Sequence, residues 1–247
     1  MWSEIFASLS PATLAVLWAG AFLGGFASGA AGFAFGIVAA SIWLHALEPI
    51  YTTILIVTGG LAMQTGTIWP LRRMLDRRRL IPTLIAVVAG VPIGVWLLVH
   101  TNISALKMAF GVFLALYGLY ALLAPRLPHV EVGVWADGLV GFISGVMGGI
   151  GGLSGVAPAI WTQLRGWPKD VGRAFYQPCI VVAHVATIVA LGTVALDRKG
   201  LVLFALALPL LVVGGWAGWS VYGRLDERRF RQMFSVLLIV SGLALVL

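Results

Sequence analysis

The chain has 247 residues, of which 60% are hydrophobic and only 10% are Asp, Glu, Lys or Arg. Because a soluble domain carries charge at roughly 25% of its positions, this composition excludes a soluble globular protein and indicates that lipid covers most of the surface. The net charge of +7 comes from short clusters of cations between apolar runs, which is typical of cytoplasmic loops and argues against nucleic-acid binding.

Ten apolar segments follow one another along the chain with short loops between them. In each half the first two segments are short and joined by glycines, whereas the other three approach the roughly 20 residues that cross a bilayer as a helix. We therefore predict an all-α, polytopic membrane protein in which each half has one short helical hairpin and three spanning helices. The segments lie near residues 11–28, 33–46, 50–70, 80–99 and 104–123, and near residues 135–149, 154–164, 172–195, 200–222 and 229–247.

Three motifs of the first half recur in the same order in the second half. The clearest is Gly-Phe-x-Ser-Gly, at residues 25–29 and again at residues 141–145. Asp-Arg followed by a second cation, and then Phe-x-Val, also recur. These matches predict an internal duplication, with repeats at residues 1–125 and 132–247 inside a single transmembrane domain.

The loop at residues 72–79 carries five arginines and one Asp, which places it in the cytoplasm by the positive-inside rule. If each short hairpin returns to the side it came from, each half crosses an odd number of times and the halves are inverted. That arrangement puts 13 of the 16 Lys and Arg residues on the cytoplasmic side, whereas parallel halves divide them equally. We therefore predict inverted repeats with both termini on the non-cytoplasmic side.

The glycine-rich turns of the two hairpins are predicted to meet near the membrane midplane and to form a binding site. Irregular backbone survives at that depth only where protein or water satisfies it, and a helix that begins after such a turn offers free N–H groups to an anion. For each single glycine the alternative is that it only allows close helix packing. The candidates are Ser28, Gly29 and Gly32 in the first turn, and Gly148, Gly149, Gly151, Gly152 and Ser154 in the second.

Polar side chains in the third segment of the second half are further candidates. Arg173 and Gln177 lie one helical turn apart on one face, next to Tyr176, and a planar guanidinium suits a sulfonate or carboxylate. Arg173 can equally be a topological charge at the cytoplasmic end. His184 lies deep in its segment, where an ionisable group suits proton coupling or a neutral hydrogen bond to a neighbouring helix. Asp137 is expected at the cytoplasmic surface, where a helix begins.

No catalytic or cofactor-binding motif accompanies these residues. The glycines of 148–155 are not followed by Gly-Lys-Ser/Thr, which excludes a nucleotide P-loop. The turns lack the carboxylates or histidines that a metal ion needs, and no Ser/His pair, Asp pair or metal triad has the spacing of an active site. We expect neither an enzyme nor a bound cofactor or metal.

The Gly-Phe-x-Ser-Gly motifs, the glycine cluster 148–155 leading into Val-Ala-Pro, and the stretch 166–178 resemble the TauE/SafE sulfite-exporter permeases. The resemblance spans almost the whole chain. It implies movement of small oxyanions, such as sulfite, sulfoacetate or other organosulfonates, across a bacterial inner membrane, usually outward. It also implies that the glycine turns and the Arg173–Gln177 stretch line the path.

The sequence therefore predicts a secondary transporter in which one half rocks against the other and exposes a small oxyanion to each side in turn. The expected partners are this oxyanion and the lipid bilayer, and assembly into a homo-oligomer is compatible with such a chain. The alternative is a non-transporting assembly or sensor subunit of the membrane. That alternative predicts that the turns tolerate Gly→Val as long as packing survives.

Overall fold

The computed structural model describes residues 10–74, 76–100, 103–123, 130–192 and 198–246. Over these residues it contains ten α-helices, one 3-10 turn and no strand, so the all-α prediction is confirmed. In the first half the elements are α2 (Pro11–Ala31), α3 (Phe35–Trp43), α4 (Pro49–Leu71), η1 (Arg72–Met74), α5 (Arg77–His100) and α6 (Ile103–Leu123). In the second half they are α7 (Val134–Gly151), α8 (Val156–Leu164), α9 (Lys169–Leu191), α10 (Arg198–Tyr222) and α11 (Glu227–Val246).

Six of the described helices are long and apolar enough to cross a membrane, namely α2, α4, α5, α7, α9 and α10. Large apolar side chains cover the outside of the bundle, among them Trp69, Val189 and Trp216. Such a surface is stable against lipid and not against water. The predicted polytopic membrane fold is therefore confirmed.

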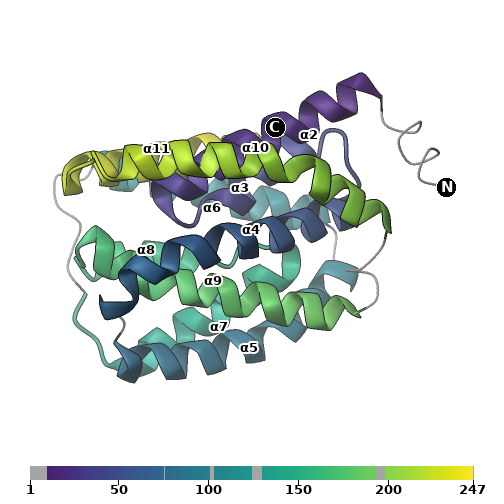
Figure 1. The fold of residues 1–247 in the computed structure, drawn as a ribbon. Helices are drawn as coiled ribbons and strands as arrows, with labels where there is room; N and C mark the ends of the chain where they lie inside the picture. The colour runs from purple at the N-terminus through teal and green to yellow at the C-terminus, as the bar shows by residue number, and fades with distance from the viewer. Residues whose placement is uncertain (1–9, 75, 101–102, 124–129, 193–197, 247) are drawn as a thin grey trace.

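The helices pack in layers (Figure 1). The pair α4 and α9 lies between the pair α2 and α10 on one side and the pair α5 and α7 on the other. The remaining pair, α6 and α11, packs against the first hairpin through contacts of α11 with α2 and α3. The central pair α4 and α9 is therefore in contact with both outer pairs. A residue on either of these two helices can contact elements of both halves of the chain.

Two helical hairpins are present, as predicted. The short helix α3 folds back on α2, because the Trp43 indole donates to the Leu17 carbonyl at 3.0 Å and Phe35 packs against Gly24. The short helix α8 folds back on α7 in the same way. There the Trp161 indole donates to the Asp137 carboxylate at 2.8 Å.

The first arm of each hairpin is longer than predicted. Helix α2 has 21 residues and α7 has 18, and both are long enough to span a bilayer, whereas α3 and α8 have 9 residues each. The sequence suggested a short first arm because the glycines begin well before the turn. In the structure the early glycines lie inside a continuous helix, where they pack against a neighbour.

Equivalent helices make equivalent contacts in the two halves. A Cβ on Gly29 of α2 would meet the Gly215 carbonyl of α10, and a Cβ on Gly149 of α7 would meet the Val91 carbonyl of α5. The bounds of α4 and α9 are 120 residues apart at both ends. The boundary between the predicted repeats, near residue 125, lies outside the described residues.

The helices that correspond to each other by position run antiparallel. In the central pair, Gln64 of α4 contacts Gln177 of α9, while Gly60 lies against His184. In the pair α6 and α11, Gly118 of α6 lies against Ser235 of α11, while Gly242 lies against the Gly111 carbonyl. A two-fold relation across the helix axes would produce this pattern.

Candidate anion pathway between the two turns

The two turns have the same backbone conformation. Gly32 has φ 82° and Gly152 has φ 74°, which is the left-handed region where a side chain is strained. Each of these glycines donates its N–H to the carbonyl four residues earlier, Ser28 at 2.6 Å and Gly148 at 2.7 Å. Glycine is therefore required at these two positions by the backbone itself.

The turns lie against each other in the interior. A Cβ on Gly36 would lie 2.8 Å from the Gly152 carbonyl oxygen, and a Cβ on Gly155 would lie 2.8 Å from the Phe33 Cβ. The N-termini of α3 and α8 are thus neighbours, and no side chain caps either of them within the described chain. At the start of α3 the first N–H groups have no hydrogen-bond partner within the described chain. In the first turn of α8, by contrast, the Val156 N–H donates to the Leu153 carbonyl at 3.3 Å. Pro158 has no N–H, which leaves that of Ala157. Free N–H groups of this kind attract anions to helix N-termini.

Ser154, a predicted binding residue of the second turn, does not cap α8. The N-cap residue of α8 is Gly155. Ser154 is fully buried, its carbonyl accepts the Ser144 hydroxyl at 2.6 Å, and its own hydroxyl has no partner among the described residues. This hydroxyl is therefore a buried donor without a partner next to the α8 N-terminus.

Side chains from α9 satisfy the carbonyl end of α2. The Arg173 guanidinium donates to the Gly29 carbonyl at 3.0 Å and to the Ser28 carbonyl at 3.4 Å. The Tyr176 hydroxyl donates to the Ala31 carbonyl at 2.6 Å. Since a helix C-terminus carries partial negative charge, a cation there is stabilising.

Arg173 is completely buried and does not act as a surface charge at the cytoplasmic end. Its guanidinium carbon lies 4.6 Å from the Trp219 ring centre and 4.4 Å from that of Tyr222. Within the described chain it forms no ion pair with a carboxylate, and its Nε has no hydrogen-bond partner. A buried cation that keeps a free donor and lacks a paired carboxylate favours an anion close by.

Gln177 joins the two central helices at the level of the first turn. Its amide nitrogen donates to Gln64 Oε1 and to the Thr67 hydroxyl, each at 2.8 Å. The Gln64 amide nitrogen in turn donates to the Gly32 carbonyl at 2.6 Å. The sequence showed Gln64 as a polar residue in a spanning segment but did not assign it to the site.

His184 lies at the second turn. Its Nε2 is 3.4 Å from the Gly152 carbonyl oxygen, and its Nδ1 has no partner among the described residues. The ring packs against α4 at Gly60, where any Cβ would collide with it. The residue is therefore held between the second turn and the central helix of the other half.

The other predicted glycines divide into packing positions and one open position. Gly29 and Gly149 lie against backbone atoms of neighbouring helices, and Gly148 lies against Ala183 and Ser154. These three glycines therefore allow close packing of the helices. A Cβ on Gly151, by contrast, would meet nothing within 4 Å.

We expect Gly151→Ala to separate binding from packing. Because alanine is the better helix former by about 0.5–1 kcal/mol, the melting temperature in detergent should not fall. If the solute approaches the second turn through this space, flux should decrease by about tenfold. Flux equal to that of the parent protein would place the solute elsewhere.

A cavity of about 380 Å³ opens between α8, α9 and α11. Three cations and one carboxylate line it, and its inner wall includes Tyr176 and two phenylalanines. The sequence treated these cations only as topological charges, because α11 is far from α9 in the chain. The charged residues and phenylalanines of the lining are Lys169, Arg228, Arg231, Glu227, Phe230 and Phe234.

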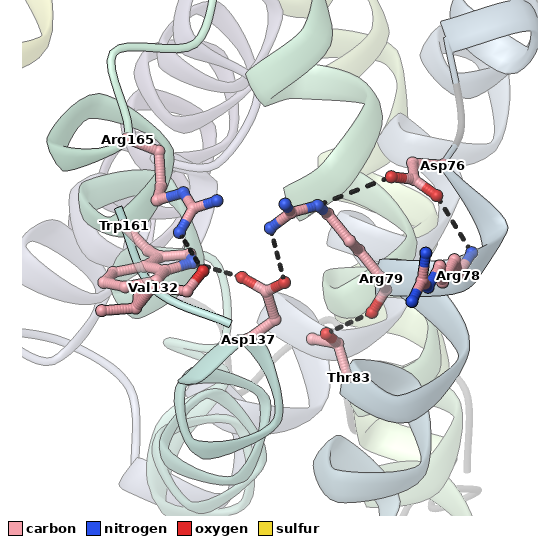
Figure 2. A network of polar contacts seen from close by, with 8 residues as sticks. All are labelled: Asp76, Arg78, Arg79, Thr83, Val132, Asp137, Trp161 and Arg165. Atoms are coloured by element: carbon pink, nitrogen blue, oxygen red, sulfur yellow. Dashed lines mark hydrogen bonds and ion pairs between the residues drawn. The ribbon is translucent and has the colours of Figure 1, made fainter. Parts of the chain in front are cut away.

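Asp137 is fully buried and does not lie at the surface, which corrects the sequence-based expectation. Figure 2 shows its carboxylate between Arg79 of α5, at 3.1 Å, and the Trp161 indole of α8, at 2.8 Å. Nearby, Arg165 donates to the Val132 carbonyl at 2.6 Å. This network fixes the base of the second hairpin to α5.

Asp137→Asn should destabilise the protein by about 3 kcal/mol, since it leaves Arg79 without its buried counter-charge. Asp76→Asn is the matched control. Asp76 pairs with the same arginine at 3.5 Å, but more than half of its side chain is exposed, so its loss should cost about 0.5 kcal/mol or less. Thermal unfolding in detergent measures both, and equal effects would contradict a structural role for the buried pair.

Comparison with protein families matches residues 17–245, nearly the whole chain, to the family described as Sulfite exporter TauE/SafE. No curated protein and no solved structure matches the chain. The family match agrees with the resemblance seen in the glycine motifs. It covers both hairpins and both central helices.

Proposed function

The chain belongs to the sulfite exporter TauE/SafE family, and we propose that it is a secondary transporter that carries a small oxyanion past the two turns. Multiple apolar helices make it a multi-pass membrane protein. The observation that carries the proposal is the buried Arg173 at the first turn, whose Nε lies 2.9 Å from where a Cβ on Gly32 would stand, together with the uncapped helix N-termini that follow the two turns. Positive partial charges and a full positive charge together favour a negatively charged solute.

The proposed binding groups come from both halves. The donors are the first N–H groups of α3, the Ala157 N–H of α8, the Ser154 hydroxyl and the Arg173 Nε, and the last two lack a partner within the described chain. Donors of this kind suit the oxygens of sulfite, sulfoacetate or another organosulfonate. Tyr176 and Gln177 would hold the first turn and the central helices in place around the anion.

The proposed orientation follows from the charges. With the arginine-rich end at residues 72–79 in the cytoplasm, both termini lie on the other side, and the cavity beside Lys169, Arg228 and Arg231 opens to the cytoplasm. Its cations would concentrate anions at the inner entrance. The bacterial inner membrane is the proposed location.

Alternating access is the proposed mechanism. The antiparallel pairing of equivalent helices supports two inverted halves, and such halves can exchange conformations with the site between them. In one conformation the inner cavity would connect to Tyr176 and the first turn. In the other, the second turn near His184 would open to the opposite side.

Reconstituted vesicles test the proposal directly. We expect saturable flux of radiolabelled sulfite or sulfoacetate, with acetate as a weaker competitor because it lacks a third oxygen for the donors. Protein-free vesicles supply the background. Absence of saturable flux for every oxyanion, in both directions, would refute the transporter assignment.

A further inference from the structure

The two turns are held by two side chains in equivalent places. Gln64 donates to the carbonyl of Gly32, and His184 lies at hydrogen-bond distance from the carbonyl of Gly152, in both cases 32 residues after the glycine. Both acceptors are the left-handed glycines at the ends of α2 and α7. One turn is thus tied by an amide and the other by an imidazole.

We infer that Gln64 and His184 are equivalent positioning residues for the two turns, and that protonation of His184 releases the second turn while the first stays tied. The predicted effect on flux rests on the proposed transport function, whereas the release of the turn itself does not. An amide does not titrate, so acid can act on only one of the two ties.

The surroundings of His184 explain why a protonated ring would leave its place between the Gly152 carbonyl and α4. With a proton on Nε2 the neutral ring donates to the Gly152 carbonyl, and a second proton would add to Nδ1. Nδ1 faces the backbone of α4 at Gly60 and has no acceptor among the described residues. A buried cation with an unpaired N–H is costly, so protonation favours a state in which the ring has left this place.

Within the part of the chain that the structure describes, no charged group compensates the ring. The groups that pack beside it are Gly60 of α4, Phe35 of α3 and the Gly152 carbonyl, and none of them titrates. On α9 itself, Cys179 lies in the apolar cluster with residues of α5. Arg173 is 11 positions away, about 16 Å along the helix.

Cysteine accessibility tests the inference without any transport assay. In a Cys179→Ala background, Gly151→Cys places a thiol at the end of α7, where an added side chain meets nothing within 4 Å. The same protein with His184→Gln provides the matched control, because glutamine is the residue that ties the first turn. Dividing the two labelling rates at each pH removes the pH dependence of the thiol itself.

The labelling rate of the protein that keeps His184 is divided by the rate of the His184→Gln control. Between about pH 7.5 and 4.5, a range around ordinary imidazole titration, this ratio should rise about fivefold, as expected for loss of one hydrogen bond. A ratio that stays constant over this range overturns the inference. A fall in the ratio does so as well, since it would mean that acid tightens the turn.

Flux gives the second readout. In proteoliposomes, acidification should reduce sulfite flux about fivefold more in the parent protein than in His184→Gln. Gln64→His places a titratable ring at the first turn as well, so its flux should fall further in acid than that of the parent protein. Measurable flux at pH 7.5 in all three proteins establishes transport separately. Flux with identical pH dependence in the parent and His184→Gln would refute the inference and leave the transporter assignment standing.

Discussion

Arg173→Gln should reduce saturable anion flux by roughly 100-fold, because removing a buried charge from a charge-assisted contact costs about 2–5 kcal/mol. Glutamine can still donate one N–H to the Gly29 carbonyl, so the end of α2 keeps part of its support. Arg173→Lys retains the charge without the planar fork and should show an intermediate loss. Flux of labelled sulfite into proteoliposomes measures all three proteins.

Arg165→Gln is the matched control for this substitution. Arg165 also donates to a backbone carbonyl, that of Val132 at 2.6 Å, and also stacks on tryptophan rings, but it lies away from both turns. Its replacement should change flux by less than about threefold, because the side chain is only partly buried and lies outside the proposed site. If both glutamine variants lost flux equally, Arg173 would act only through general stability.

Gly152→Val should both destabilise the protein and abolish flux. Valine at a positive φ is strained by at least about 1–2 kcal/mol, and its Cβ would also meet Ile56 and Val57 of α4. Together these effects should lower the free energy of unfolding by about 3 kcal/mol. Thermal unfolding and flux are measured on the same preparation.

Gly138→Val is the control for that experiment, because a Cβ on Gly138 of α7 would meet nothing within 4 Å and its φ is ordinary. It should retain both stability and flux. The result also separates the transporter from a non-transporting membrane subunit. Retention of flux by Gly152→Val would contradict the role of the turn.

The helices and the two turns could be predicted from the sequence for physical reasons. In lipid a spanning segment must satisfy its own backbone polar groups, and a long apolar run does so as a helix. Hydropathy alone therefore located segments such as 200–222, which matches α10 closely. The duplication identified the two glycine-rich turns, and the left-handed backbone at Gly32 and Gly152 shows why each turn needs a glycine.

The environment of the polar residues could not be predicted in the same way. Whether Arg173 faces the cytoplasm or the interior depends on Trp219 and Tyr222, which are distant in sequence. Asp137 looked like a surface residue because its partners Arg79 and Trp161 lie on other helices. Such contacts depend on how helices cross, which local pattern does not encode.

The pairing of Gln64 with His184 could not be predicted from residue type, but it can be found from position in the chain. Their residue types differ, so similarity of sequence does not connect them. Their constant distance from the two turn glycines does. When residues are counted from the turn glycine of each half, position in the chain identifies the equivalent residues of the two halves even where their types differ.

Binding of selenite, a heavier analogue of sulfite, tests most directly whether an anion sits between the two turns. In a crystal of the protein soaked with selenite, we expect an anomalous selenium peak within about 4 Å of the Arg173 Nε or the Ser154 Oγ, the distance from selenium to a donor that hydrogen-bonds one of its oxygens. A peak confined to the cavity between α8, α9 and α11, in a protein that transports selenite, would contradict a site at the turns.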